Sequence, residues 1–291
     1  MKPASFEYFR PSTLDEALAT MAAHAGEAKA LAGGQSLVPA MNFRIAQPAV
    51  LVDLNGISGL DGIEATTDGL RVGALTRHRT LERSAEVREA APLVADTMPL
   101  VAHVPIRTRG TLGGSLAHAD PAAELPAVML ALDADIEVCS QSGQRTIPAG
   151  EFFTGLYATA LAPDELITAV TIPRRNSAAW AVDEVARRHG DFALAGVASV
   201  VRLEITGAVA GARIALFGVH ERAVLADAAA KAIVGQVPTA EAIEAAADTA
   251  ASQDADPASD VHASSAFRRH LTRVLVRRVL TRAVARARGA E

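Results

Sequence analysis

The spacing of apolar residues in the first part of the chain predicts short strands that alternate with helices. Residues 12–26 are expected to form a helix, because Ser12 or Thr13 can cap it and apolar residues recur on one face. A second helix is predicted over residues 77–87, with Thr76 as its cap. Apolar runs typical of strands lie at residues 6–11, 28–34, 49–57, 69–76 and 164–175.

The segment between these strands predicts one strongly apolar helix and one hairpin. Residues 124–134 place Leu125, Met129 and other apolar residues on one helical face. Residues 135–153 predict a hairpin that turns at Ser142–Gly143. Strands and helices alternate here without the strict repeat of a doubly wound parallel sheet, so we predict an α+β fold for the first domain.

The pattern changes near residue 177, where longer alternating runs begin. Residues 179–205 and 207–219 predict three strands of an antiparallel meander. Helices are expected at residues 224–234, 239–251 and 266–287, the last with Phe267, Leu271, Val274, Leu275 and Val279 on its core face. We therefore divide the chain into a first domain of residues 1–177 and a second of residues 178–291.

Composition narrows the classes of function. The 291 residues contain no apolar run of about 18 residues, and the N-terminus lacks a signal-peptide core, so a cytoplasmic protein is expected. Cys139 is the only cysteine, which excludes an internal disulfide and an iron–sulfur cluster held by this chain alone. The net charge of −5 disfavours nucleic-acid binding, and the arginines of the last helix are interpreted as a solvated face.

Two double-glycine segments are the strongest candidates for a binding site. The first, AGGQS, runs from Ala32 to Ser36, and the second, TLGGS, from Thr111 to Ser115. Glycines allow backbone N–H groups to converge on a diphosphate, and a helix that starts after the loop adds a partial positive charge. The hydroxyls of Ser36, Thr111 and Ser115 are further donors. Each loop alone is also compatible with a tight turn between a strand and a helix.

Other motifs for nucleotide or covalent chemistry are missing from the sequence. No G-x-G-x-x-G follows a strand, and no P-loop or nucleophile elbow occurs. His118, Asp120 and Glu124 lie close together in the sequence and are residue types that bind metals. Asp120 precedes Pro121, which favours an extended segment and not a helix, and no further metal ligand stands out elsewhere in the sequence. We therefore expect no metal and no catalytic side chain. Glu124 suits either ribose hydroxyls or the dipole of the helix that it begins.

Three segments together give a resemblance to a known family. AGGQS, TLGGSLAHADPAAELPA and RRHGDFALAGVA resemble the FAD-binding medium subunit of molybdenum hydroxylases, the carbon monoxide dehydrogenase and xanthine dehydrogenase group. The resemblance extends over essentially the whole chain. It implies a two-subdomain FAD-binding fold of the vanillyl-alcohol oxidase type, followed by a small C-terminal domain with an antiparallel sheet and helices.

The resemblance also implies a set of FAD contacts. The two glycine loops would hold the diphosphate, Val101 and Ala102 would line the flavin with His118 close by, and Glu124 would bond the ribose. Ile167 would pack near the cofactor, and Phe192 would lie near the isoalloxazine ring. The implied FAD-binding residues are Ala32, Gly33, Gly34, Gln35, Ser36, Val101, Ala102, Thr111, Leu112, Gly113, Gly114, Ser115, His118, Glu124, Ile167 and Phe192.

This sequence departs from the family at three positions. Relatives often have His where Gln35 stands and Ile where Leu112 stands, and both changes keep the backbone donors. Some relatives place a lysine near the flavin just before the RRHGDFA segment, where this chain has Asp183 and Glu184. The departure removes a cation that would stabilise a reduced, anionic flavin.

The function implied is electron transfer by a flavoprotein oxidoreductase subunit. FAD would receive electrons from the [2Fe–2S] clusters of a small subunit, which in turn serves a large molybdopterin-binding subunit, and would pass them to an external acceptor. The complex is expected to be a dimer of heterotrimers. Two alternatives remain at this point: a free-standing flavin-dependent oxidoreductase of the same fold, and a non-catalytic scaffold whose glycine loops are only turns.

Overall fold

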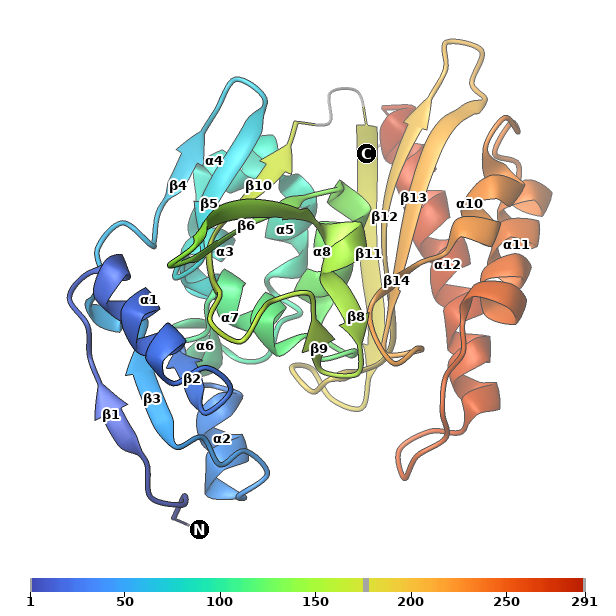
Figure 1. Cartoon of the computed structure of the whole chain (residues 1–291). Coiled ribbons are helices and arrows are strands. Elements are labelled where there is room, and N and C mark those ends of the chain that lie inside the picture. The colour runs from blue at the N-terminus through green and yellow to red at the C-terminus, as the bar shows by residue number, and fades with distance from the viewer. Residues whose placement is uncertain (1, 175–177, 290–291) are drawn as a thin grey trace.

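The computed structural model describes residues 2–174 and 178–289. Its N-terminal subdomain is a small parallel sheet in the order β1-β3-β2, with α1 and α2 packed beside it (Figure 1). Its elements are β1 (Glu7–Phe9), α1 (Leu14–Ala23), β2 (Ala28–Leu31), α2 (Leu37–Asn42), β3 (Val50–Asp53) and the short helix η1 (Leu54–Gly56).

The middle subdomain is built on an antiparallel sheet in the order β4-β5-β10-β6-β7. Its strands are β4 (Ile63–Ala65), β5 (Gly69–Gly73), β6 (Asp135–Ser140), β7 (Gly143–Pro148) and β10 (Leu166–Pro173), and β8 (Phe153–Gly155) pairs separately with β9 (Ala158–Thr159). Its helices are α3 (His78–Arg83), α4 (Ala85–Ala90), α5 (Pro92–Thr97), α6 (Val104–Arg107), α7 (Leu112–His118), α8 (Glu124–Leu132) and α9 (Ala149–Phe152). The predicted hairpin is confirmed as β6 and β7.

The C-terminal part is a four-stranded antiparallel sheet whose far face is covered by helices (Figure 1). The sheet order is β11-β12-β13-β14, so the predicted three-stranded meander is confirmed and extended by one short strand. The elements are β11 (Ala178–Ala186), β12 (Ala193–Leu203), β13 (Val209–Phe217), β14 (Val224–Leu225), α10 (Asp227–Ile233), α11 (Ala240–Thr249), η2 (Ala250–Asp254) and α12 (Ser265–Ala287).

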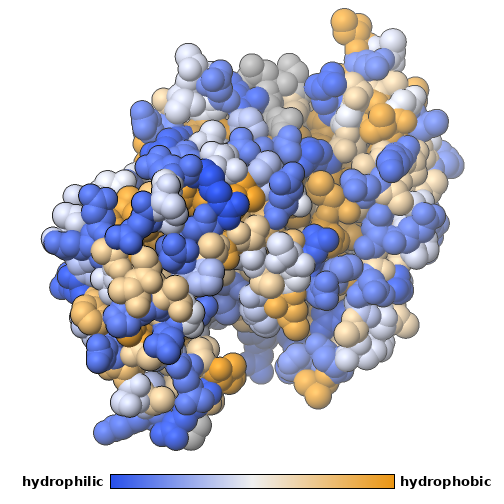
Figure 2. Space-filling view, in the orientation of Figure 1, coloured by the Kyte–Doolittle hydropathy of each residue, from blue (hydrophilic) through white to orange (hydrophobic). Residues whose placement is uncertain are grey.

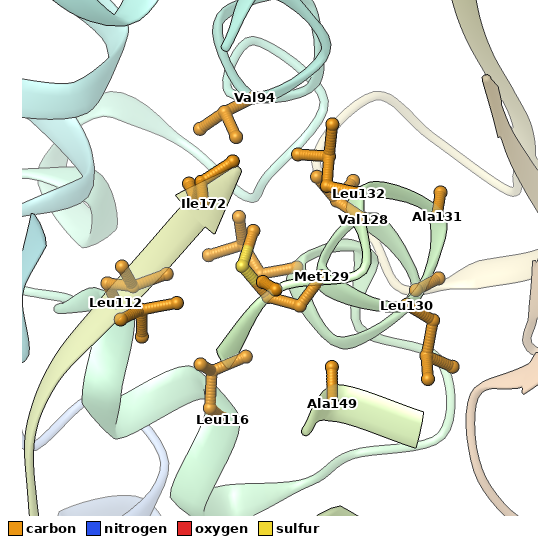
Figure 3. Close-up of a cluster of buried hydrophobic side chains, with 14 of the residues drawn as sticks. Val94, Leu112, Leu116, Val128, Met129, Leu130, Ala131, Leu132, Ala149 and Ile172 are labelled. Carbon is orange, nitrogen blue, oxygen red and sulfur yellow. The ribbon is translucent and has the colours of Figure 1, made fainter. Parts of the chain in front are cut away.

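Helix α8 joins the two parts of the molecule. Its residues are all buried, because one side packs on α5 and β10 and the other on β12 and β13. Figure 3 shows Met129 pointing from α8 into the space beside Leu112, Leu116 and Ile172. The apolar cluster around α8 also includes Val200 and Phe217 of the C-terminal sheet. Since both parts share this core, α8 fixes their relative position.

Several sequence predictions are wrong in detail. Phe267 is 44% exposed, because α12 turns a neighbouring face, with Leu271, Leu275 and Val279, toward the sheet. The predicted helix 224–234 begins only at Asp227, since the preceding residues pair with β13.

The helix predicted at residues 77–87 is broken in two at Ser84, which caps α4. Thr76 does not cap the first of these helices, because its hydroxyl bonds the backbone of Gly62 instead. The proposed boundary at residue 177, and the end of the strand predicted at 164–175, fall on residues outside the described ranges.

The described residues form an α+β structure of two domains, which agrees with the fold class predicted for the first domain. In these residues, no helix combines the length and the apolar character needed to cross a membrane.

Candidate cofactor-binding site

The first glycine loop presents unused backbone donors. It connects β2 to α2, and Gly34 has φ +72°, a conformation that a side chain at this position would strain. Within the described part of the chain, the backbone N–H groups of residues 33–36 form no hydrogen bond. The loop lines a hollow of about 340 Å³, together with the start of α2 and Arg109. This loop therefore fits the diphosphate role expected of it.

Polar side chains beneath the loop hold it in place. The Asn55 amide donates to the carbonyl of Ala32 at 2.9 Å, and Asp53 accepts from the Asn55 backbone at 3.0 Å. Arg77 donates to Asn55 Oδ1 at 2.6 Å and also to the carbonyl oxygen of Arg109. Arg77 thus ties the first glycine loop to the segment that leads into the second.

The two glycine loops lie against each other. A Cβ atom on Gly33 would overlap the carbonyl oxygen of Arg109 and lie 2.8 Å from Cα of Gly110. A Cβ atom on Gly114 would lie 3.8 Å from the Ala32 side chain. Only glycine at position 33 permits the approach to Arg109 and Gly110, so the first loop lies against the segment that leads into the second.

The second loop differs from the expectation in its backbone donors. The N–H groups of Leu112 and Gly113 donate to the carbonyls of Thr76 and Ala74 at 3.0 and 2.8 Å. The N–H of Gly114 is bonded to Thr111 Oγ1 at 3.1 Å, because Thr111 is the N-cap of α7. Thr111 and Gly113 are buried, so the groups of this loop that remain accessible to a ligand are the partly exposed Gly114 and Ser115.

The predicted flavin-lining pair is fixed by a buried arginine. Arg107 Nη1 donates to the carbonyls of Val101 and Ala102, both at 2.9 Å, and its other nitrogens bond Glu82. Ala102 has φ +46°, so the turn is strained and needs these bonds. No sequence pattern marks Arg107, since its partners become neighbours only through the turn.

The segment after β11 reaches this turn. A Cβ atom on Gly190 would lie 3.0 Å from the Ala102 carbonyl and still closer to the His103 ring. The ring of His103 also lies 6.3 Å from that of His189. Phe192 follows in the same segment and is 63% exposed, so its ring is free to cover a ligand.

The predicted residues at the other end of α7 form a polar cluster. The His118 ring lies 5.2 Å from the Tyr157 ring, and the Tyr157 hydroxyl donates to Asp120 at 3.3 Å. Burial lowers the pKa of His118, and burial followed by Asp120 raises the pKa of Tyr157. His118 is the last residue of α7, so the extended segment expected here begins only after it. Tyr157 was missed, because nothing in its sequence context marks it.

Glu124 and Ile167 lie deeper than the other predicted residues. Glu124 is 6% exposed, and its pKa is raised to about 7 by burial, with a smaller contribution from Asp120. Ile167 is also 6% exposed and lies in β10, next to a β-bulge. Helix α7 includes residues 112–115 of the second segment and rises about 9 Å from Leu112 to His118, so the site extends from a diphosphate cradle to an acidic and aromatic end.

The space-filling view shows where the N-terminal subdomain meets the rest of the molecule. Figure 2 shows the outline of the molecule indented at the bottom, between the N-terminal subdomain and the rest. The backbone donors of residues 33–36 and the contact of Gly33 with the second loop fit a dinucleotide that carries a diphosphate.

Comparisons with known proteins agree with this site. Residues 4–175 match the family model of the FAD binding domain in molybdopterin dehydrogenase, and residues 180–283 match that of the CO dehydrogenase flavoprotein C-terminal domain. The chain is 41% identical to the 6-hydroxypseudooxynicotine dehydrogenase complex subunit alpha of Paenarthrobacter nicotinovorans, over 99% of this chain and 97% of the relative. It is 36% identical to the carbon monoxide dehydrogenase medium chain of Hydrogenophaga pseudoflava, over 98% of this chain and 99% of the relative.

A solved structure extends the similarity to three dimensions. A chain of the carbon monoxide dehydrogenase from Hydrogenophaga pseudoflava superposes with a TM-score of 0.95 at 38% identity, over 98% of this chain and 99% of that one. The chain therefore belongs to the family of FAD-binding medium subunits of molybdenum hydroxylases. It is a flavoprotein oxidoreductase subunit, and its cofactor is FAD, as the sequence resemblance implied. The interpretation of the glycine loops as turns alone is not supported.

Proposed function

We propose that this chain holds FAD across its two glycine loops and transfers electrons from the [2Fe–2S] clusters of a small partner subunit to an external acceptor. A large molybdopterin-binding subunit would carry out the hydroxylation, and the complex would be a dimer of heterotrimers in the cytoplasm. The observation that carries the proposal is the contact of Gly33 with Arg109 and Gly110, beside a loop whose backbone N–H groups are unused.

Each part of the site has a role in binding the cofactor. The N–H groups of residues 33–36 would donate to the diphosphate, and the hydroxyl of Ser115 would add to them. The proposed FAD contacts are Ala32, Gly33, Gly34, Gln35, Ser36, Val101, Ala102, Thr111, Leu112, Gly113, Gly114, Ser115, His118, Glu124, Ile167 and Phe192. We also propose the two-subdomain fold of the vanillyl-alcohol oxidase type for residues 1–177, followed by the C-terminal domain at residues 178–291.

The protein's contribution is to place the cofactor and to shield it. When bound, FAD supplies the redox chemistry, since it accepts and releases electrons that no side chain of this chain can carry. Arg107 keeps the Val101–Ala102 turn rigid, and Phe192 is free to exclude water from the ring. No side chain is assigned as a general acid or base.

The lone cysteine supports a partnered role. Cys139 is buried in β6, and one thiol cannot hold an iron–sulfur cluster, so the clusters must lie on another chain. The relatives named above are described as a complex subunit and a medium chain, and this chain matches nearly their whole length. A free-standing flavin oxidoreductase is therefore not favoured.

Purification from the native host tests the proposal. An affinity-tagged copy of this chain is expected to copurify with a molybdenum-containing chain and an iron–sulfur chain, with one FAD per tagged chain. Metal analysis and flavin release measure both. A chain that purifies alone, contains FAD and turns over a small substrate without partners would support the free-standing oxidoreductase instead.

A further inference from the structure

One arginine lines the hollow beside the first glycine loop. The hollow has a volume of about 340 Å³, and it is lined by residues 31–35, by residues of α2 and by Arg109. Val38 and Pro39 make the α2 side of it largely apolar. Among the described residues that line the hollow, Arg109 is the only one that carries a charge. The hollow therefore combines the unused backbone N–H groups of the loop with a single guanidinium group.

The backbone of Arg109 is held in place by contacts that do not involve its side chain. Its N–H donates to the carbonyl of Ile106 at 3.0 Å, and its own carbonyl accepts a hydrogen bond from Arg77. A Cβ atom on Gly33 would lie 2.9 Å from the carbonyl carbon of Arg109. Because all three contacts use backbone atoms of Arg109, a substitution of its side chain leaves the packing of the two segments unchanged.

The guanidinium group of Arg109 has no partner within residues 2–174 and 178–289. It forms no ion pair with a carboxylate there and donates no hydrogen bond. In contrast, the guanidinium group of Arg107, two residues earlier, is bonded to Glu82 and to two backbone carbonyls. The donors of Arg109 are therefore free for a ligand in the hollow.

The neighbouring arginine is already used to support the loop. Arg77 donates to Asn55 Oδ1 at 2.6 Å and to the carbonyl of Arg109. Burial and then the positive charge of Arg109 lower the pKa of Arg77, whereas Asp61 and Asp53 act in the opposite direction. Since Arg77 contacts the backbone of Arg109, two like charges lie beside the loop. An anion in the hollow would reduce the repulsion between them.

A diphosphate in this hollow needs opposite charge as well as hydrogen bonds. The backbone N–H groups of residues 33–36 and the hydroxyl of Ser115 are neutral donors. The helices that follow the loops, α2 and α7, have only 6 and 7 residues, so their dipole moments are small. Arginine suits phosphate oxygens because its planar guanidinium group offers several N–H donors together with a permanent charge. Arg109 has the property that the glycine loops lack.

We propose that Arg109 binds the diphosphate of FAD and supplies positive charge to a site whose loops offer neutral donors. The inference rests on the proposed function, because it takes FAD as the ligand of the glycine loops. Arg109 lies outside both glycine motifs and is a binding residue in addition to the FAD contacts proposed above. A contact between opposite charges is weakened by salt, so part of the FAD affinity depends on ionic strength through this side chain.

FAD titration of substituted chains tests the role of Arg109. Arg109→Gln is expected to bind FAD about tenfold more weakly than the wild type, because a charge-assisted hydrogen bond is lost. Arg109→Lys keeps the charge and should retain most of the affinity. Arg202→Gln is the matched control and should bind as the wild type does, since Arg202 is an exposed arginine of β12 in the C-terminal domain. Thermal unfolding shows whether each variant folds.

The salt dependence of FAD affinity separates a charge contact from a change in packing. When salt is raised from about 0.05 M to about 0.5 M, the affinity of the wild type and of Arg202→Gln should fall, and that of Arg109→Gln should fall less. Wild-type affinity that does not change with salt would overturn the proposal even if Arg109→Gln failed to fold. An equal fall in the wild type and in Arg109→Gln would overturn it as well.

The same titrations distinguish this inference from the proposed function. If the wild-type chain binds FAD and a folded Arg109→Gln variant binds it equally well, only the role of Arg109 is refuted. If the wild-type chain binds no FAD at any salt concentration, the proposed function fails, and the inference fails with it.

Discussion

Replacement of Gly33 by alanine tests whether the two loops form one cradle. The new Cβ atom would lie 2.8 Å from Cα of Gly110 and 2.9 Å from the carbonyl carbon of Arg109, whereas an ordinary contact begins at 3.4 Å. Because these neighbours are backbone atoms and the carbonyl oxygen of Arg109 lies closer still, the two segments must separate by more than 0.6 Å, the difference between 2.8 and 3.4 Å. Overpacking of this kind costs about 1–3 kcal/mol.

That cost should appear mainly in FAD affinity. If the loops have to close again to align their donors on the diphosphate, affinity falls by about 5- to 150-fold. The assay is quenching of FAD fluorescence on titration with the FAD-free chain, together with thermal unfolding to confirm that the variant folds. Gly150→Ala is the matched control, since nothing lies within 4 Å of its Cβ position. Wild-type affinity in a folded Gly33→Ala variant would refute the reasoning.

Three further predictions concern stability and the flavin-lining turn. His78 is buried with its pKa lowered to about 4, so its contribution to stability is complete above pH 6.5 and is lost as the pH falls toward 4. Urea unfolding of the wild-type chain should show that the free energy of unfolding falls by about 3 kcal/mol as the pH is lowered from 6.5 toward 4, and this fall should be missing in His78→Gln. The same pH dependence in the variant as in the wild type would contradict this. Gly196→Ala should lower the free energy of unfolding by about 1–3 kcal/mol, because the new methyl group would overlap the ring of Phe217. Gly211→Ala is the control: nothing lies within 4 Å of its Cβ position, so its free energy of unfolding should stay within about 0.5 kcal/mol of the wild type. Arg107→Met should weaken FAD binding and lower stability by about 2–4 kcal/mol, since two carbonyls lose their donor; an FAD titration that matches the wild type would show that the turn does not line the site.

The sequence was most informative where apolar pattern and burial agree. The helix at residues 124–134 is predicted from apolar residues on one face, and the structure confirms the helix but buries it on all sides. The glycine pairs stand out in the sequence because glycine lets a backbone approach a diphosphate closely, and Gly33 does lie against Arg109 and Gly110, which lead into the second loop. Both features follow from residues that are neighbours in the sequence, so they can be predicted without knowledge of the fold.

The remaining features depend on contacts between distant segments. Thr76 has the right chemistry for a helix cap, but Gly62 competes for its hydroxyl. Phe267 has the right spacing for the core, but the sheet meets an adjacent face of its helix.

The central claim is that the diphosphate of FAD lies on the first glycine loop where it meets the second. A crystal structure of this chain with FAD tests it most directly. We predict diphosphate density within hydrogen-bond distance of the backbone N–H groups of residues 33–36, with the flavin toward Ala102 and His118. Density for FAD at any other place on the chain, or binding that leaves these N–H groups without a partner, would contradict the account.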